Sequence, residues 1–303
     1  MLQILTHIWQ SSAGYWFSSL LLAFGGLLIP QASLLGQEKR DGIDQLRLVE
    51  NQLFFARSNQ KPGLLIPLYI YPTDVFENAS YNQVMQLKRQ HTGLPFWVIL
   101  NPASGPGKQI DANYTKAIDR LIGSGCQVLG YVPTGYGKTN SRDVANDIEK
   151  WRQFYPRVQG IFFDEMVYED SAEGVQHQQN LKRFARQHGY WPVVGNPGAD
   201  TPGRYFAGEV ADVIVIHESA DWPTENKLHG NYFGGRADYP SFNRAVLVHS
   251  QSNLDLEALK TIKKYSKWLY VTQDTYLPNN SHQQNPWDQL SEHLQDLCEA
   301  LEK

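Results

Sequence analysis

Three acidic residues stand at the ends of two apolar runs in this sequence. Asp164 and Glu165 end the run VQGIFFDE, and Glu218 lies near the end of VADVIVIHES. Acidic side chains are rarely fully buried without a partner, so their place beside apolar segments needs an explanation. Hydrolysis of a glycosidic bond uses two carboxyl groups, one that protonates the leaving oxygen and one that attacks the sugar or activates water. We therefore take Asp164, Glu165 and Glu218 as candidate catalytic residues.

Other apolar runs also become polar where they end. The polar and aromatic residues at these ends are Tyr69, Tyr71, Asn101, Tyr131, Tyr136, Asn196, His249 and Asp274. Amides suit sugar hydroxyls and aromatic rings suit stacking on sugars, so we predict that these residues bind substrate. A carboxylate at one strand end can instead cap a helix or pair with a nearby base. Two adjacent acids, with a third at an equivalent height two strands away, favour catalysis.

These residues need a scaffold that brings eight segments of the chain to one end. From residue 63, short apolar runs alternate with segments in which apolar residues recur every three or four positions; the runs are 63–72, 95–102, 126–134, 158–165, 191–198, 210–219, 244–250 and 268–276. Alternating buried strands and helices predict a parallel sheet covered by helices. Eight such units predict an α/β fold, the TIM (β/α)8 barrel, over residues 63–303. The alternative is an open doubly wound sheet, but no Gly-rich dinucleotide turn follows the first run.

In such a barrel the carboxyl ends of the strands form the mouth, where active sites lie. The ends of the fourth and sixth strands face each other across part of this mouth, at roughly the 5–10 Å that glycosidase carboxyl pairs occupy. Neighbouring residues of a strand point to opposite faces, so we expect only one of Asp164 and Glu165 to point straight into the cleft. By the same rule His217 opposes Glu218 and packs in the interior.

Composition and motifs argue against several other classes of function. The net charge of −4 and the absence of a basic run make nucleic acid an unsuitable partner. Two cysteines exclude a disulfide-dense scaffold. The strings TGYGKTN and SGPGKQ look like phosphate loops but lack the glycine spacing of a P-loop. His217, Glu218, His249 and Asp274 form no spaced metal motif, so we expect no metal and no cofactor.

The amino-terminal region differs from the rest of the chain. Residues 1–37 contain no charged side chain and include a leucine-rich stretch that ends in small residues. This pattern predicts a secretory signal peptide or a membrane anchor, although the usual preceding Lys or Arg is missing. A buried globular helix is the alternative. Residues 38–62 are polar with a helical middle, and we interpret them as a linker or helix. We expect a secreted, periplasmic or membrane-anchored protein with its barrel outside the cytoplasm.

Four phrases of the barrel region together resemble one protein family. LLIPLYIYP, VILNPASGPG, VLGYVPTGYG and GIFFDEM are similar to spherulation-specific family 4 (spherulin 4), whose hydrolase members form glycoside hydrolase family 135. The likeness runs from about residue 63 through at least residue 218. It implies a TIM barrel and endo-hydrolysis of α-1,4-linked N-acetylgalactosamine in secreted galactosaminogalactan-like polysaccharides. The acidic residues of the family map onto Asp164, Glu165 and Glu218.

The leading hypothesis is therefore an exported endo-glycosidase, a monomer whose partner is a polysaccharide. In an α-linked N-acetylhexosamine the 2-acetamido group lies on the same side as the leaving oxygen and cannot attack from behind, so two enzyme carboxyl groups are required. We expect Asp164 or Glu165 on one side of the bond and Glu218 on the other. The alternative, from another class, is a non-catalytic carbohydrate-binding or cell-surface barrel. A polysaccharide deacetylase would need a metal site, for which the sequence has no motif.

Overall fold

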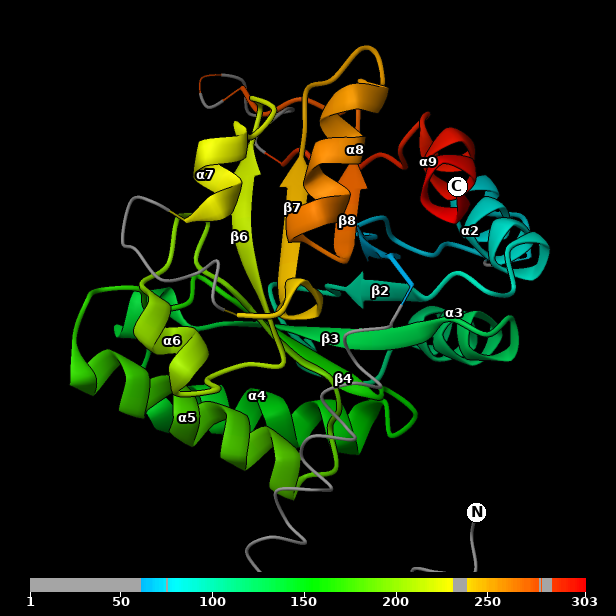
Figure 1. Ribbon diagram of the computed structural model, residues 1–303. Helices are drawn as coiled ribbons and strands as arrows, with labels where there is room; N and C mark the ends of the chain where they lie inside the picture. Colours follow the sequence, from blue (N-terminus) through cyan, green and yellow to red (C-terminus); the bar gives the residue numbers. More distant parts are fainter. Residues whose placement is uncertain (1–60, 75, 231–238, 278, 280–284) are drawn as a thin grey trace, which may run out of the picture. The chain divides into compact units, whose positions relative to one another are not determined.

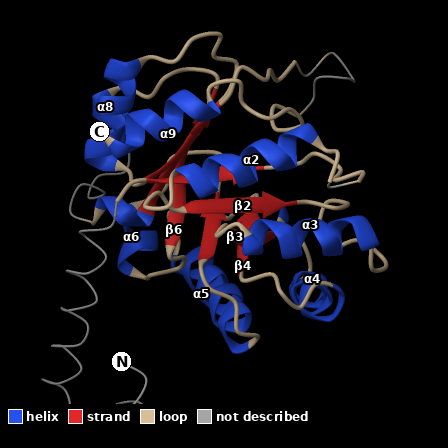
Figure 2. Ribbon diagram, turned by 90° about the vertical axis from the view of Figure 1, so that its right-hand side faces the viewer, coloured by secondary structure: helices blue, strands red, loops and turns tan. Residues whose placement is uncertain are grey.

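The computed structural model describes residues 61–303 except 75, 231–238, 278 and 280–284. Within these ranges, eight strands close into a barrel in the order β1-β2-β3-β4-β5-β6-β7-β8. Helices lie around the outside of the strands (Figures 1 and 2). The predicted TIM (β/α)8 barrel is confirmed. The predicted segment 1–37 and the linker 38–62, apart from its last two residues, lie outside the described residues.

All neighbouring strands pair in parallel, and β8 pairs with β1 to close the ring. The strands are β1 (Gly63–Pro67), β2 (Phe96–Leu100), β3 (Gln127–Pro133), β4 (Gly160–Asp164), β5 (Val193–Asn196), β6 (Val213–Ser219), β7 (Arg244–Val248) and β8 (Trp268–Val271). The helices are α2 (Ala79–Gln90), α3 (Ala112–Gly123), α4 (Ser141–Phe154), α5 (Ala172–Gln187), α6 (Gly203–Ala207), α7 (Glu225–His229), α8 (Leu256–Tyr265) and α9 (Leu294–Glu302), with short 3₁₀ turns at Gly135–Gly137 and Ser241–Asn243.

The ends of the long helices follow local chemistry that the sequence contains. Side-chain oxygens cap α2, α3, α4, α5 and α8 by accepting a backbone N–H of the first turn, which satisfies donors that would otherwise be unpaired; the capping residues are Asn78, Asp111, Asn140, Ser171 and Asp255. Gly125 and Gly189 follow α3 and α5 with φ angles of 96° and 81°, a region that suits glycine. The helices therefore start and stop where short-range signals place them.

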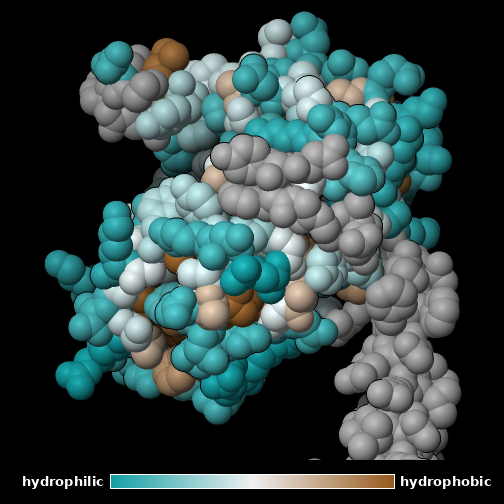
Figure 3. Space-filling model, turned by 60° about the vertical axis from the view of Figure 1, so that its left-hand side comes forward, coloured by the Kyte–Doolittle hydropathy of each residue, from teal (hydrophilic) through white to brown (hydrophobic). Residues whose placement is uncertain are grey.

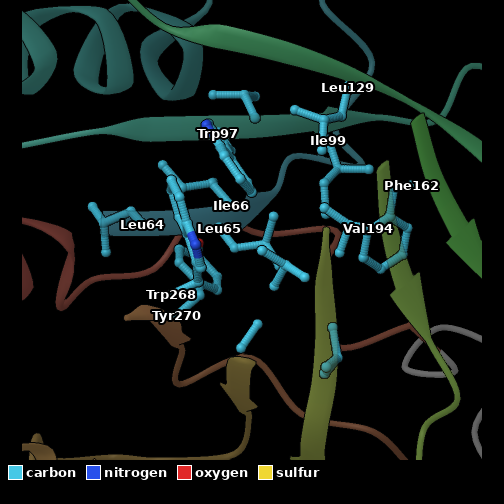
Figure 4. Packing of buried hydrophobic residues seen from close by; sticks show 14 of the residues in the cluster. Leu64, Leu65, Ile66, Trp97, Ile99, Leu129, Phe162, Val194, Trp268 and Tyr270 are labelled. Carbon is cyan, nitrogen blue, oxygen red and sulfur yellow. The ribbon is translucent and has the colours of Figure 1, made fainter. Parts of the chain in front are cut away.

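The barrel is filled with apolar side chains near the amino ends of its strands. Trp97 of β2 stacks on Trp268 of β8 with ring centroids 3.4 Å apart, and the two rings lie among Leu64, Leu65 and Ile66 (Figure 4). The strands β1, β2, β7 and β8 are buried at every position. The outer surface in the view of Figure 3 is mostly hydrophilic, with small hydrophobic areas. The polar side chains of the strands lie instead at the opposite, carboxyl ends.

One close helix–strand contact positions a residue of the mouth. A Cβ atom at Gly130 of β3 would lie 2.5 Å from the Trp151 ring of α4, so only glycine lets this indole lie against the strand. The Trp151 indole N–H donates a 2.9 Å hydrogen bond to the carbonyl oxygen of Tyr131. Trp151 is fully buried. This contact fixes the backbone from which the Tyr131 side chain extends.

The carboxyl-terminal helix is shorter than the sequence pattern predicts. A helix is predicted over 286–303, but α9 covers only Leu294–Glu302, so the prediction is wrong for the first eight residues. There the backbone N–H groups of Gln289 and Ser291 bond to the side chains of Asp274 and Tyr270, at 3.0 and 2.9 Å, rather than to helix carbonyls. Among the described helices none is both long and apolar enough to cross a membrane.

Candidate active site

Asp164 is the last residue of β4, and its carboxyl group is held by the two strands beside it. The Tyr131 hydroxyl on β3 donates a 2.7 Å hydrogen bond to Oδ2 of Asp164. Nδ2 of Asn196 on β5 donates a 2.8 Å hydrogen bond to Oδ1. Asn196 lies directly in register with Asp164, so the pairing of β4 with β5 brings these side chains together.

Glu218 on β6 reaches the same amide nitrogen from the other side. Asn196 Nδ2 donates a 2.6 Å hydrogen bond to Oε2 of Glu218, and the Trp287 indole N–H donates one of 3.1 Å to Oε1. The facing oxygens of Asp164 and Glu218 are therefore separated by no more than these two Asn196 bonds laid end to end. This limit applies to one pair of oxygens, and it brings the two carboxyl groups close enough to act on a single glycosidic bond.

The orientation of the Asn196 amide is fixed by its own oxygen. Oδ1 of Asn196 accepts a 3.0 Å hydrogen bond from the backbone N–H of Gly198. An amide whose oxygen is bound in this way must present its nitrogen, with two hydrogens, to the carboxyl groups. The Asn196 side chain is only 4% exposed, and this burial further restricts the orientation of its amide. It links Asp164 and Glu218 by one hydrogen bond each.

Burial and mutual repulsion shift the ionisation of both carboxyl groups in the same direction. Burial and the neighbouring Asp164 charge raise the pKa of Glu218 from 4.5 to about 7, against the hydrogen bonds from Asn196 and Trp287 that lower it. Burial also raises the pKa of Asp164, while hydrogen bonds from Tyr131, the Glu165 backbone and Asn196 oppose the shift. Two such groups do not ionise independently. Near neutral pH the pair is set up to hold one proton between its two carboxyl groups.

Aromatic rings form the wall beside the carboxyl pair. Tyr69, which follows β1, meets Tyr131 edge-on with ring centroids 5.7 Å apart. Burial, with the nearby Asp164, Tyr131 and Glu218, raises the pKa of the Tyr69 phenol well above its usual value. Burial and Asp164 also raise the pKa of Tyr131. Both phenols stay neutral, so they act as hydrogen-bond donors and as apolar faces for a sugar ring.

Glu165 leaves the strand direction and faces a different partner. Its φ angle is 53°, and its Oε2 accepts a 3.2 Å hydrogen bond from the backbone N–H of Gly135. Its carbonyl oxygen accepts 2.6 Å and 2.7 Å hydrogen bonds from the Tyr136 N–H and the Thr134 hydroxyl. Backbone in this region costs energy in a residue with a side chain and is concentrated at functional sites. Glu165 thus fastens the turn after β3 to the end of β4.

Tyr136 stands on that turn, above the acidic residues. It also has a positive φ angle, 54°, and 41% of it is exposed. Its ring meets that of Tyr168 edge-on at 6.1 Å. Burial raises the pKa of Tyr136, with further contributions from Asp164, Glu165 and Glu218, which places the phenol near all three carboxyl groups. Tyr136 and Tyr168 offer an exposed aromatic surface at the rim.

Tyr71 and Asn101, both predicted to bind substrate, have partners within the protein. The Tyr71 hydroxyl donates a 3.0 Å hydrogen bond to Asp111 and accepts one of 3.0 Å from Asn113. Oδ1 of Asn101 accepts a 2.9 Å hydrogen bond from the backbone N–H of Gly105. Neither of these contacts involves the carboxyl pair. The two residues shape the region around the loop between β2 and α3.

His249 and Asp274 lie on the side of β7 and β8. His249 contacts Ser250 Oγ through Nδ1 at 2.9 Å and meets the Trp287 ring edge-on at 5.9 Å. Burial lowers the pKa of His249, so it is neutral at pH 7. Asp274 is 5% exposed, and its side chain accepts hydrogen bonds from Thr275 and Gln289. His249 therefore borders the site through Trp287, and Asp274 holds the following loop.

Trp287 is the site residue that the sequence reasoning missed. It lies in the loop before α9, is 5% exposed, and donates to Glu218. Its carbonyl oxygen also accepts a 3.2 Å hydrogen bond from the Tyr69 backbone. The periodic pattern assigns this segment to a helix, and no motif marks the tryptophan. A proline–tryptophan pair directly before a helical pattern is the one signal that would have separated it from the helix.

His217, next to Glu218, is packed in the interior as predicted. It is 3% exposed, and its Nε2 lies 2.8 Å from the carbonyl oxygen of Asp221. Burial lowers its pKa to about 4, so the ring is neutral. Within the described ranges no group of three or more His, Cys, Asp and Glu side chains is arranged to hold a metal ion. The pair Asp164 and Glu218 is the part of this mouth that is suited to acid–base and nucleophilic chemistry.

Comparisons with known proteins agree with this architecture. A model of the spherulation-specific family 4 matches residues 63–301. The chain is 33% identical to Spherulin-4 of Physarum polycephalum over 179 residues, which are 58% of this chain and 49% of that protein. The chain thus spans about half the length of this curated relative. The crystal structure of Aspergillus clavatus Sph3 in complex with GalNAc matches 81% of this chain and 99% of that chain, with a TM-score of 0.66 and 25% identity.

The family match begins at the first residue of β1 and extends into α9, so it includes every strand and every residue of the carboxyl pair. The phrases that carry the likeness in the sequence lie on β1, β2, β3 and β4 and on the loops that follow them. From this coverage it follows that the chain belongs to spherulation-specific family 4.

Proposed function

We propose that this protein is an endo-acting glycoside hydrolase that cleaves α-1,4-linked N-acetylgalactosamine in an exopolysaccharide. The observation that carries the proposal is the hydrogen bonding of one amide nitrogen, Asn196 Nδ2, to both Asp164 and Glu218. This arrangement supports a pair of carboxyl groups that act together on one glycosidic bond. Because residues 1–37 contain no charged side chain, we also propose that the protein acts outside the cytoplasm, secreted or membrane-anchored.

The comparisons support a carbohydrate-active barrel. Sph3, 25% identical and similar over nearly its whole length, was solved in complex with GalNAc. An N-acetylhexosamine substrate is therefore the first choice for this chain. The tyrosines around the carboxyl pair suit a sugar ring, because an aromatic ring offers an apolar face and a phenol offers a hydrogen-bond donor.

Glu218 is the general acid of the proposed reaction. Its pKa of about 7 keeps it protonated below neutral pH, where an ordinary glutamate is ionised. Its carboxyl proton passes to the glycosidic oxygen as the bond between that oxygen and C1 breaks. The Trp287 indole and the Asn196 amide hold the carboxyl group in place and stabilise the carboxylate that remains.

Asp164 is the nucleophile. Its carboxylate attacks C1 from the side opposite the leaving oxygen and forms a glycosyl ester. Asp164 accepts hydrogen bonds from Tyr131, Asn196 and the Glu165 backbone, one more than Glu218 accepts, which favours its ionised form. The Glu218 carboxylate then takes a proton from water, the hydroxyl attacks C1, and the ester bond to Asp164 breaks. Two inversions give net retention of the α configuration.

The direct test is a reducing-end assay on α-1,4-linked N-acetylgalactosamine polymer with the purified full-length chain. We expect the wild type to release oligosaccharides and Glu218→Gln to lower the rate by about 10³-fold or more. A matched control is Glu149→Gln, which makes the same change on the exposed face of α4. Equal rates for the two variants, or glycan binding without new reducing ends, would refute hydrolysis and leave the binding-protein alternative.

A further inference from the structure

A second hollow, of about 380 Å³, lies beside the loops that follow β1 and β2. Its wall consists of Tyr71, the β2–α3 loop, the first turn of α3 and Tyr155. Two of its lining segments, at Tyr71 and in the β2–α3 loop, follow barrel strands and so belong to the mouth, whereas Tyr155 follows α4. Its volume falls within the ~300–1,000 Å³ of small-molecule sites.

The hollow is close to the carboxyl pair along the chain. The Tyr69 ring contacts the ring of Tyr131, with centroids 5.7 Å apart, and the Tyr131 hydroxyl donates a 2.7 Å hydrogen bond to Asp164. Tyr71 lines the hollow and follows Tyr69 by two residues, so their Cα atoms are at most about 7 Å apart. This distance is comparable to the length of a sugar unit. A polysaccharide chain that passes Tyr69 therefore reaches Tyr71 within a few units.

The lining of the hollow suits a sugar ring. Tyr71 is 48% exposed and Ile110 is 58% exposed, which gives the wall an apolar surface that solvent reaches. The Tyr155 hydroxyl oxygen accepts a 3.1 Å hydrogen bond from the Asp111 backbone N–H. Tyr155 is only 2% exposed and forms a buried part of the wall.

The Tyr71 ring is held rigidly in place. Its hydroxyl is fixed between Asp111 and Asn113, and its ring meets Tyr114 edge-on at 5.7 Å. Tyr114 is 3% exposed and belongs to the first turn of α3. A preorganised ring loses little conformational entropy when a ligand binds, which favours affinity. Such a fixed, half-exposed ring is a binding feature rather than a mobile surface residue.

The geometry points to a distal subsite of the same glycan chain: the hollow beside Tyr71 binds a sugar unit a few positions from the bond at Asp164 and Glu218. This inference rests on the proposed function for the identity of the chain, an N-acetylhexosamine polysaccharide. It predicts that affinity depends on the length of the glycan, because only chains long enough to reach from Tyr69 past Tyr71 gain the contact. Short substrates bind at the carboxyl pair alone.

Filling the hollow tests this subsite. Ala112→Trp places a large ring in the hollow from an exposed position, and Ala207→Trp makes the same change at the amino-terminal end of the barrel as a control. Each is combined with Glu218→Gln, and binding of α-1,4-linked N-acetylgalactosamine trimers and dodecamers is measured by calorimetry. We expect Ala112→Trp to weaken binding of the dodecamer about tenfold and to leave the trimer unchanged.

The outcomes separate the subsite from the hydrolysis proposal. Unchanged binding of the dodecamer, or equal weakening for trimer and dodecamer, would overturn the subsite. If the wild type binds the glycan but does not cleave it, the hydrolysis proposal is refuted. The comparison of trimer and dodecamer binding still tests the subsite. If the wild type binds neither chain, both proposals fall. Should Ala112→Trp fail to fold, Ile110→Ser removes the exposed apolar side chain of the same wall and is expected to weaken dodecamer binding in the same direction.

Discussion

Acidic side chains at the two sides of the barrel mouth are held in opposite ways. Asp111, on the side of β2, accepts hydrogen bonds from two backbone N–H groups, at 2.8 and 3.4 Å, and from the Tyr71 hydroxyl at 3.0 Å. Asp164 and Glu218, on the side of β4 and β6, share the nitrogen of Asn196. Asp111 stands alone among its donors, whereas Asp164 and Glu218 are buried beside each other and joined through one amide.

This comparison indicates what makes a carboxyl group at the barrel mouth reactive. A carboxylate at a helix start with backbone donors is stabilised as an anion and serves the helix. Two carboxyl groups that are buried together repel each other, so one of them retains a proton near neutral pH. Residue type is the same in both regions. Burial and the presence of a second carboxyl group separate a structural acid from a catalytic one.

The largest expected effect comes from one substitution made in both regions. Asp164→Asn removes the nucleophile and should lower kcat by about 10³-fold or more. On a trimer, which does not reach the hollow, Asp111→Asn should keep kcat within about twofold because asparagine also caps helices well. Rates of reducing-end release and melting curves for both variants provide the measurement. A similar loss in both variants would show that the two regions are not functionally distinct.

A smaller change should separate the roles within the carboxyl pair. Trp287→Phe removes a hydrogen bond to Glu218 that lowers its pKa, so the pKa of Glu218 should rise. The alkaline limb of the kcat/KM profile should then move to higher pH, because the general acid keeps its proton longer, with a loss of activity of about tenfold. The acidic limb, set by Asp164, should stay in place. Movement of the acidic limb instead would reverse the assigned roles.

The raised pKa of Glu218 also predicts a cost in stability. Between pH 4.5 and about 7 the native protein binds more protons than the unfolded chain, so stability falls as pH rises through this window. Glu218→Gln cannot ionise and should be more stable than the wild type at pH 8, by roughly 2 kcal/mol after allowance for solvent screening. At pH 4 the two should unfold alike. Denaturant unfolding at both pH values measures this difference. If Glu218→Gln is no more stable than the wild type at pH 8, the Glu218 carboxylate is not destabilised by burial.

The smallest expected effect is in the other region. Tyr71→Phe removes hydrogen bonds to Asp111 and Asn113 but keeps the ring, so it should lower the free energy of unfolding by about 1 kcal/mol. Because the aromatic face remains, binding of long glycan chains should change little. Urea unfolding and calorimetry measure the two quantities. A loss of glycan binding as large as that expected for the filled hollow would assign the contact to the hydroxyl and not to the ring.

The fold was predictable because its signals are local. Apolar runs recur eight times along the chain, and side-chain caps begin α2, α3, α4, α5, α7 and α8; each signal needs only its neighbours to be recognised. The convergence of Asp164, Asn196 and Glu218 was also predictable in outline, since the ends of barrel strands meet at one mouth. Asn196 was expected to bind substrate, and the structure places its amide nitrogen between the carboxyl groups.

Other parts of the site depend on contacts between distant segments and could not be predicted. Trp287 reaches Glu218 only because Asp274 and Tyr270 bind the following backbone N–H groups and stop the helix from starting there. Strand alternation could not place Glu165, because its positive φ angle takes it out of the strand. Side-chain to backbone bonds across the fold decide such positions, and a single sequence does not reveal them.

The most direct test of the account is the anomeric configuration of the first product. Proton NMR during hydrolysis of α-1,4-linked N-acetylgalactosamine oligosaccharides distinguishes the α from the β anomer before they equilibrate. Because the proposed mechanism has Asp164 as a nucleophile and inverts C1 twice, it predicts that the α anomer appears first. Initial release of the β anomer would mean that a water molecule, and not Asp164, attacks the sugar, and would contradict the account.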